Sequence, residues 1–285
     1  MRFQRIIEQV YFRPWYITPA AHFAIHRILS SHLDRKAGEN DDLSISDLFV
    51  SRPAAMMTDQ KLAIIHAKGP LGKGLSKMEK TCGATDYADL RAEISGAIAQ
   101  GARGILLQVD SPGGTVLGTR EVAAQIAASP VPVVVYTEDI MASAAYYISA
   151  GASRIIASPS SMVGSIGVYI PWMDYADQLK AMGLKPDPII NTGGDLKALG
   201  FSGTLSRTER DYLQDEVDRD FGLFRAHVLQ FRGVPESAMR GQVLSGEAAL
   251  EAGLVDELGD FSVAYADLLH RAGGPIASPE PAPTS

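Results

Sequence analysis

The 285-residue sequence predicts an α/β fold in which repeated β-α-β units build a mostly parallel sheet. Two observations support this fold class. Apolar strand-like runs alternate with runs of helical periodicity between residues 61 and 157, at a spacing that is typical of crossover helices. In addition, 46% of the residues are hydrophobic, so the chain can bury the core of one large domain with appendages or of two small domains.

The predicted elements follow one another along the chain. The run 131–136 is β-branched and flanked by prolines and polar residues, which is typical of a buried strand, and 86–99 carries Leu90, Ile94 and Ile98 at helical spacing. Strands are predicted at 61–67, 104–110, 131–136 and 154–157, and further extended segments at 164–169 and 255–258. Helices are predicted at 86–99, 115–128, 172–182, 206–234 and 262–271, a loop at 69–83 and a tight turn at 111–114.

Three regions are expected from composition. Residues 1–58 are an N-terminal helical segment and linker, with helical spacing at 5–11 and 19–33 and a polar, acidic stretch at 37–48. Residues 59–272 contain the α/β elements, and residues 273–285 are a Pro-rich tail that is expected to be disordered.

Charge and cysteine content exclude several classes of protein. The net charge is −7 and no basic block occurs, which argues against nucleic acid as a partner. Cys82 is the single cysteine, so an internal disulfide and a Cys-rich metal site are excluded. Charged residues and Pro14 interrupt the apolar N-terminus, so neither a secretory signal nor a membrane anchor is expected, and a cytoplasmic protein is predicted.

One pair of histidines has a spacing that suits a metal. His22 and His26 are four residues apart, and His32 follows them. The nearest carboxylate on that face is Asp34, so packing or surface roles are favoured and no metal site is predicted.

Ser143 is the candidate nucleophile. It lies between small alanines where the strand 131–136 gives way to a helix-like run ending at Ile148. The first turn of a helix has free backbone N–H groups and a positive dipole end, which suit the anion formed when a serine attacks a carbonyl. A simple packing or N-cap role for Ser143 is the alternative.

A serine nucleophile needs a base, because its hydroxyl is hardly ionised near neutral pH. No histidine occurs between residues 67 and 226, although His66 or His227 could be recruited from a distance. Lysine is the other candidate, and a free lysine, with a pKa near ~10.4, serves as a base only where burial lowers that pKa. From residue 81 onward the lysines are Lys180, Lys185 and Lys197, of which Lys197 lies in a glycine-flanked loop.

The turn 111–114 offers a place for the oxyanion. Gly113 and Gly114 present backbone N–H groups at the carboxyl end of a predicted parallel strand, where sites of such sheets form. A tight turn that merely needs glycine is the alternative reading.

Several motifs together resemble the signal peptide peptidase A family of Ser-Lys serine peptidases. The resemblance covers residues 60–260, and the family includes the protease IV enzymes and the head-maturation (capsid assembly) proteases of tailed phages and prophages. The motifs are DSPGG at 110–114, MASAAY at 141–146, VGSIGV at 163–168, QVLSGEAA at 242–249 and GLVD at 253–256.

The resemblance implies a Clp/crotonase-like fold and a homo-oligomer. It implies Ser143 as nucleophile, Lys197 as general base and Ser165 as the residue that orients the lysine. Gly113 and Gly114, with the N–H of Ala144, would form the oxyanion hole. No metal, nucleotide or other cofactor is implied.

Departures from the family decide the subtype. We expect neither the membrane anchor nor the tandem core of some members, while EQVYFRPWYITPAA at 8–21 resembles the N-terminus of phage-encoded members. The resemblance therefore implies a prophage head-maturation protease that cuts scaffold and capsid proteins, in the cytoplasm or within a procapsid. Because only a short tail follows Arg271, we expect any scaffold to be a separate protein.

Other functions are kept open. A soluble housekeeping peptidase resembling the signal peptide peptidases would use the same pair of residues. A crotonase-like enzyme acting on an acyl-CoA would share the glycine-rich oxyanion loop but would leave Ser143 and Lys197 without a role. An inactive subunit of an assembly would be insensitive to Ser143→Ala.

Overall fold

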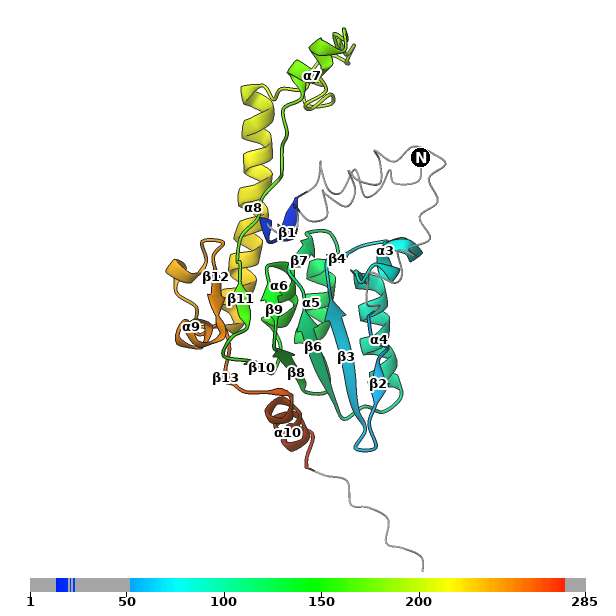
Figure 1. Cartoon of the computed structure of the whole chain (residues 1–285), viewed down its shortest axis with the longest axis vertical. Coiled ribbons are helices and arrows are strands. Elements are labelled where there is room, and N and C mark those ends of the chain that lie inside the picture. Colours follow the sequence, from blue (N-terminus) through cyan, green and yellow to red (C-terminus); the bar gives the residue numbers. More distant parts are fainter. Residues whose placement is uncertain (1–13, 20, 22, 24–51, 275–285) are drawn as a thin grey trace, which may run out of the picture.

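The computed structural model describes residues 14–19, 21, 23 and 52–274, and its centre is a six-stranded sheet (Figure 1). The strand order is β13-β10-β8-β6-β3-β2. All neighbouring strands are parallel except β2 against β3. The bounds are β2 Met56–Met57, β3 Leu62–Lys68, β6 Gly104–Asp110, β8 Val133–Thr137, β10 Arg154–Ala157 and β13 Glu257–Leu258. The predicted α/β class and its mostly parallel sheet are thus confirmed.

Alternation along the strands separates the two faces of this sheet. In β3, Ala63 and Ile65 belong to the larger apolar core, whereas Leu62 and Ile64 belong to a smaller core on the other side. Successive side chains of a strand point to opposite faces, which explains why the buried strands are apolar throughout.

Helices cover both faces. The larger core includes residues of α4 Tyr87–Ala99, α5 Thr119–Ala127, α6 Ala144–Ser149 and α8 Arg207–Phe231. The smaller core includes Ala264 and Leu268 of α10 Phe261–Arg271, which packs on the opposite face (Figure 1). Parallel strands need such crossover helices, so the two layers follow from the strand order.

Two small sheets follow the carboxyl ends of β6 and β8. One has the order β1-β7-β4-β5 and the other the order β12-β11-β9. The first contains β1 Trp15–Ile17, β4 Leu71–Gly72, β5 Thr85–Asp86 and β7 Gly113–Thr115. The second contains β9 Ile140–Ala142, β11 Met162–Gly164 and β12 Val243–Ser245, which leads into α9 Gly246–Glu251.

Three predicted connections differ from the structure. The expected loop 69–83 contains β4 and the helix α3 Lys77–Thr81, which begins with a capping box between Ser76 and Glu79. The expected turn 111–114 is partly a strand, because Gly113 and Gly114 pair with β1 and β4. The helix predicted from Thr115 begins only at Thr119, since Thr115 is still part of β7.

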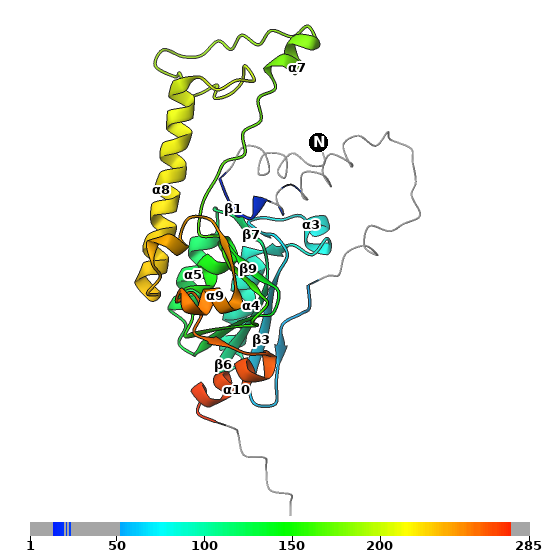
Figure 2. The same cartoon turned by 60° about the vertical axis from the view of Figure 1, so that its left-hand side comes forward.

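Residues 172–219 form a projection that we call the arm. It comprises α7 Ala176–Ala181, the segment after it and the N-terminal half of α8, and in both views it extends beyond the sheet (Figures 1 and 2). The 25 residues of α8 correspond to a length of about 38 Å. Its buried residues are Asp220, Phe224 and Val228, all in the second half, so only that half packs on the core. The helix predicted at 172–182 is confirmed only for its later part.

Some predictions concern residues outside the described ones. They are the helix at 5–11, most of the helix at 19–33, the linker at 37–48, the residues His22, His26 and His32, and the tail at 276–285. The region boundaries at 58 and 272 remain predictions. Residues 15–17, which we placed in the N-terminal segment, form β1 and pair with the core strand β7.

A buried arginine joins the end of α8 to the sheet. Arg232 Nε donates to the Ala150 carbonyl and Nη2 to the Ala152 carbonyl, each at 2.8 Å, and Nη1 lies 2.7 Å from Asp256 Oδ2. The same carboxylate oxygen accepts from the Ile155 N–H at 2.7 Å. The guanidinium therefore satisfies two carbonyls and one partly buried charge.

We expect Arg232→Ala to lower the free energy of unfolding by about 3 kcal/mol, because the two carbonyls and the carboxylate would lose their donor. Urea denaturation measures the change. The control is Arg240→Ala at an exposed position, which should stay within about 0.5 kcal/mol of the wild type. Equal effects of the two substitutions would refute this account of the Arg232 cluster.

Candidate active site

Ser143 occupies a sharp turn between β9 and α6. Its φ is 57° and its ψ −116°, a backbone conformation that L-residues rarely adopt. Its N–H donates to the Gly164 carbonyl at 2.7 Å, and its carbonyl accepts from the Tyr147 N–H at 2.8 Å. Strain of about 1–3 kcal/mol persists only where the surroundings enforce it, and such residues cluster at functional sites.

The turn at Ser143 lies in the interior of the protein. Ser143 is 1% exposed, and all six residues of α6 are buried. Alanines on both sides of Ser143 leave room for close approach, as the sequence suggested. Ala144 is the first residue of α6, where a backbone N–H has no partner within the helix.

The two glycines of β7, Gly113 and Gly114, lie next to the turn at Ser143. A methyl group built on Gly113 would lie 2.9 Å from Ser143 Cβ, so the two residues are in direct contact. A methyl group on Gly114 would lie 1.9 Å from the Leu71 carbonyl oxygen. Both positions therefore require glycine because neighbouring backbone approaches closely, and Gly113 also has a φ of 109°.

The Gly113 N–H already has a partner. It donates to Ser111 Oγ at 3.2 Å, and Ser111 is fully buried. Of the proposed oxyanion donors, the Gly113 N–H is thus held inside its own turn, while Gly114 lies one residue further along the strand. This geometry favours Gly114 over Gly113 as the donor.

Ser165 follows the residue that anchors Ser143. It is 5% exposed, with a φ of 51°, and its N–H donates to the Gln242 carbonyl at 2.7 Å. Gly164, immediately before it, accepts from the Ser143 N–H. The structure therefore brings together Ser143, Ser165, Gly113 and Gly114, with Ala144 adjacent in sequence.

Lys197 lies elsewhere. It is exposed, on the part of the arm between α7 and α8, and its N–H donates to the Gly194 carbonyl at 2.8 Å. In both views this part of the arm lies at the far end of α8 from α6 (Figures 1 and 2). One chain therefore does not bring Lys197 to Ser143.

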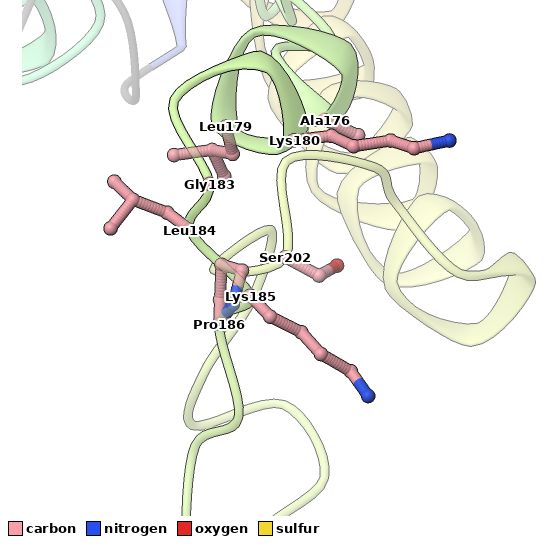
Figure 3. Close-up of a pocket in the computed structure, with 8 residues that line it drawn as sticks. All are labelled: Ala176, Leu179, Lys180, Gly183, Leu184, Lys185, Pro186 and Ser202. Atoms are coloured by element: carbon pink, nitrogen blue, oxygen red, sulfur yellow. The ribbon is translucent and has the colours of Figure 1, made fainter.

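A hollow on the arm contains the other two lysines that follow residue 81. Lys180 and Lys185 line it together with Leu179, Leu184 and Ser202 (Figure 3). The leucine side chains lie on one side of the hollow and the lysine amines on the other. Neither Ser143 nor Lys197 lines it, so it is not the predicted site.

The histidines named as alternative bases have other contacts. His227 Nε2 lies 3.0 Å from the Tyr147 carbonyl oxygen, and its ring stacks on Tyr147 at 4.4 Å. Burial lowers the pKa of His227, and burial followed by the charge of Lys68 lowers that of His66. His66 is on β3 of the main sheet. None of these contacts joins an imidazole to Ser143.

Sequence reasoning missed β1, which lies directly at this site. Trp15–Ile17 pairs antiparallel with Gly113–Thr115, and Trp15 also forms a bridge with Tyr169. The signal was present as three consecutive apolar or aromatic residues after Pro14, too short to distinguish a strand from a helix segment.

The described part of the chain holds neither a candidate metal site nor a candidate membrane span. No group of three His, Cys, Asp or Glu side chains there is arranged to hold a metal ion. No helix among those residues has the length and apolar character needed to cross a bilayer.

Comparison with known proteins places these residues in context. A family model described as Peptidase family S49 matches residues 125–273. A protein of Methanocaldococcus jannaschii that is named as a protease is 35% identical over 185 residues, covering 62% of this chain and 58% of its own length. Protease 4 of Salmonella typhi is 29% identical over 249 residues, covering 85% of this chain and 40% of its own length.

A phage protein is also similar. The head-tail preconnector protein of Enterobacteria phage P21 is 30% identical over 203 residues, or 69% of this chain and 40% of its own length. The chain thus spans 58% or less of each of these three relatives.

Among solved structures, a ClpP1 chain from Listeria monocytogenes has a TM-score of 0.47 and 14% identity, covering 70% of this chain and 93% of that chain. The α/β class is established by the strand order of the main sheet.

The close approach at Gly114 leads to a prediction about stability. Gly114→Ala should lower the free energy of unfolding by about 1–3 kcal/mol or more, because the new methyl group must displace the Leu71 backbone. Thermal or urea unfolding measures it. The matched control is Gly222→Ala at an exposed position of α8, where nothing lies within 4 Å of the added methyl group and stability should rise by about 0.5–1 kcal/mol. Tolerance of alanine at Gly114 would contradict the geometry of β7.

Proposed function

The chain belongs to peptidase family S49, and from this membership we propose that it is a serine endopeptidase whose nucleophile is Ser143. The observation that carries the proposal is the buried, positive-φ turn at Ser143, in contact with Gly113 of β7. A nucleophile held in this way is oriented before substrate binds, and backbone donors lie beside it.

The proposed reaction proceeds in two steps. Ser143 Oγ attacks the carbonyl carbon of a peptide bond while its proton passes to the base, and the Gly114 and Ala144 N–H groups hold the oxyanion. The C–N bond breaks, the amine leaves with a proton from the base, and a water molecule then hydrolyses the acyl-enzyme. No cofactor takes part in this scheme.

Lys197 is proposed as the base, supplied by a second copy of the chain. The family resemblance motivates the choice of lysine, and the exposed arm motivates the second copy. The arm carries exposed apolar side chains, among them Met182, Leu184, Ile189 and Phe201. Exposed apolar surface of this kind marks an interaction site, so we assign the arm to contacts within a homo-oligomer. In that contact Ser165 would orient the lysine.

Protein chains are the proposed substrates. Similarity to a phage head-tail preconnector protein supports a role in head maturation, in which scaffold and capsid proteins are cut within a procapsid. A housekeeping peptidase is the second candidate, because Protease 4 of Salmonella typhi aligns with 85% of this chain. An assay on the scaffold protein of the same phage separates the two candidates. Cleavage of that scaffold supports head maturation, and no cleavage supports the housekeeping peptidase.

The first test replaces the two residues of the dyad. Ser143→Ala and Lys197→Ala should each reduce cleavage of unfolded casein by about 10³-fold or more, because nucleophile and base act as a unit. Lys185→Ala on the same arm is the control and should retain activity. An active Lys197→Ala variant would return His66 and His227 as candidate bases. An inactive wild type that binds CoA would favour the acyl-CoA alternative. An inactive wild type that binds no CoA would favour the assembly alternative.

The second test asks whether the dyad forms between chains. An equimolar mixture of the Ser143→Ala and Lys197→Ala chains, allowed to reassemble, should regain roughly a quarter of the wild-type rate, since random neighbours restore one site in four. The Ser143→Ala chain mixed with the double variant should regain nothing. Failure of the first mixture, with mixed oligomers verified by mass spectrometry, would place both residues in one chain.

A further inference from the structure

The strand β1 lies where an extended substrate would be expected at this site. On one side Trp15–Ile17 pairs antiparallel with Gly113–Thr115 of β7. On the other side the Trp15 N–H donates to the Tyr169 carbonyl at 3.0 Å, and the Tyr169 N–H donates back at 3.3 Å. Peptides commonly bind by adding a strand to an exposed edge, so β1 has the arrangement of a bound peptide between two walls.

The register places one particular carbonyl at the proposed oxyanion donor. The Thr18 N–H donates to the Pro112 carbonyl at 3.0 Å, and the Val116 N–H to the Pro14 carbonyl at 3.5 Å. Hydrogen-bonded pairs alternate with non-bonded pairs in an antiparallel ladder. Tyr16 and Gly114, which are partners in the register, are therefore a bonded pair, and the Tyr16 carbonyl faces the Gly114 N–H.

Ser143 borders the same peptide unit. A methyl group built on Gly113 would lie 2.1 Å from the Tyr16 carbonyl oxygen, 3.0 Å from Ile17 Cα and 2.9 Å from Ser143 Cβ. The proposed nucleophile and the Tyr16–Ile17 peptide bond thus lie on either side of one small space that only a glycine leaves open.

The Tyr16 side chain fills an aromatic pocket. It is fully buried, stacks on Tyr147 with ring centroids 5.7 Å apart, and meets Phe224 edge-on at 5.1 Å. Its hydroxyl donates to the Asp220 carbonyl at 2.9 Å. The pocket therefore offers both an apolar wall and an acceptor, which together select a tyrosine-like side chain.

We infer that β1 is the enzyme's first substrate, and that the peptidase cuts its own chain between Tyr16 and Ile17. The inference rests on the proposed function, and it adds a substrate class: extended segments with an aromatic residue immediately before the cleaved bond. Since Lys197 lies away from Ser143 within one chain, the cut follows assembly.

Cleavage of the Tyr16–Ile17 bond consumes one water molecule and no other co-reactant. Ser143 Oγ bonds to the Tyr16 carbonyl carbon as its proton passes to the base. The Tyr16–Ile17 bond breaks, and the Ile17 nitrogen leaves as an amine with that proton. Water then attacks the ester, giving a Tyr16 carboxylate and restoring the serine.

Intact-mass measurement of the assembled full chain tests the inference. The wild type should lose residues 1–16 and acquire Ile17 as its new N-terminus, while Ser143→Ala stays whole. Casein cleavage is measured on the same preparation. A wild type that cuts casein but keeps residues 1–16 overturns the inference and leaves the peptidase proposal standing. A wild type that cuts neither overturns both.

Variants at Tyr16 separate recognition from chance cleavage. Tyr16→Phe should still be cut, because the ring fills the pocket, whereas Tyr16→Asp should not, because the pocket would bury an unpaired charge. Because Tyr16→Asp also alters the core, the same change is made in a separate peptide of residues 12–21. The wild-type peptide should be cut after Tyr16, and the Asp peptide with a kcat/KM lower by about tenfold or more. No cut in the wild-type peptide, a cut at another bond, or equal rates for the two peptides would sink the inference.

Discussion

The positive-φ turn at Ser143 is the constraint on which the site depends. A φ of 57° is unfavourable for serine, so other contacts must hold it. The Gly164 carbonyl fixes the Ser143 N–H, β9 pairs in parallel with β11, and the whole of α6 is buried behind the turn. Burial of a side chain such as Ile148 contributes about 1.5–3 kcal/mol, so the buried side chains of α6 together exceed the strain. The small sheet β12-β11-β9 therefore holds the nucleophile in position.

A second constraint is the backbone contact at β7. Gly113 and Gly114 let the backbones of Tyr16 and Leu71 approach to distances that no side chain allows. The same absence of side chains opens the space in front of Ser143. A strand that pairs with β7 must therefore pass its carbonyls by the nucleophile, whether the strand is β1 or another peptide. The pairing of a strand with β7 and its access to Ser143 therefore both depend on Gly113 and Gly114.

Most of the main sheet could be predicted from sequence because its signal is local. The β-branched run at Val133–Thr137 and the amphipathic run at Tyr87–Ala99 fold much as their patterns indicate. Ser143 at a strand-to-helix junction was predictable for the same reason. β7 was predicted as a turn because glycines favour turns, and its pairing with Leu71 and Tyr16 depends on residues distant in sequence. The place of Lys197 was not predictable, because it depends on the direction in which α8 projects.

The arm and β1 have opposite relations to the nucleophile. β1 reaches Ser143 within its own chain, whereas Lys197 is carried away from it by α8. A single chain thus holds a peptide at the serine but lacks the proposed base, and so can bind without cutting. Assembly would supply the base to a site whose occupant is already in register with Gly114. Removal of that occupant by hydrolysis would then open the edge of β7 to other chains. On this argument the oligomer is a condition of activity, and β1 determines when the edge of β7 becomes available.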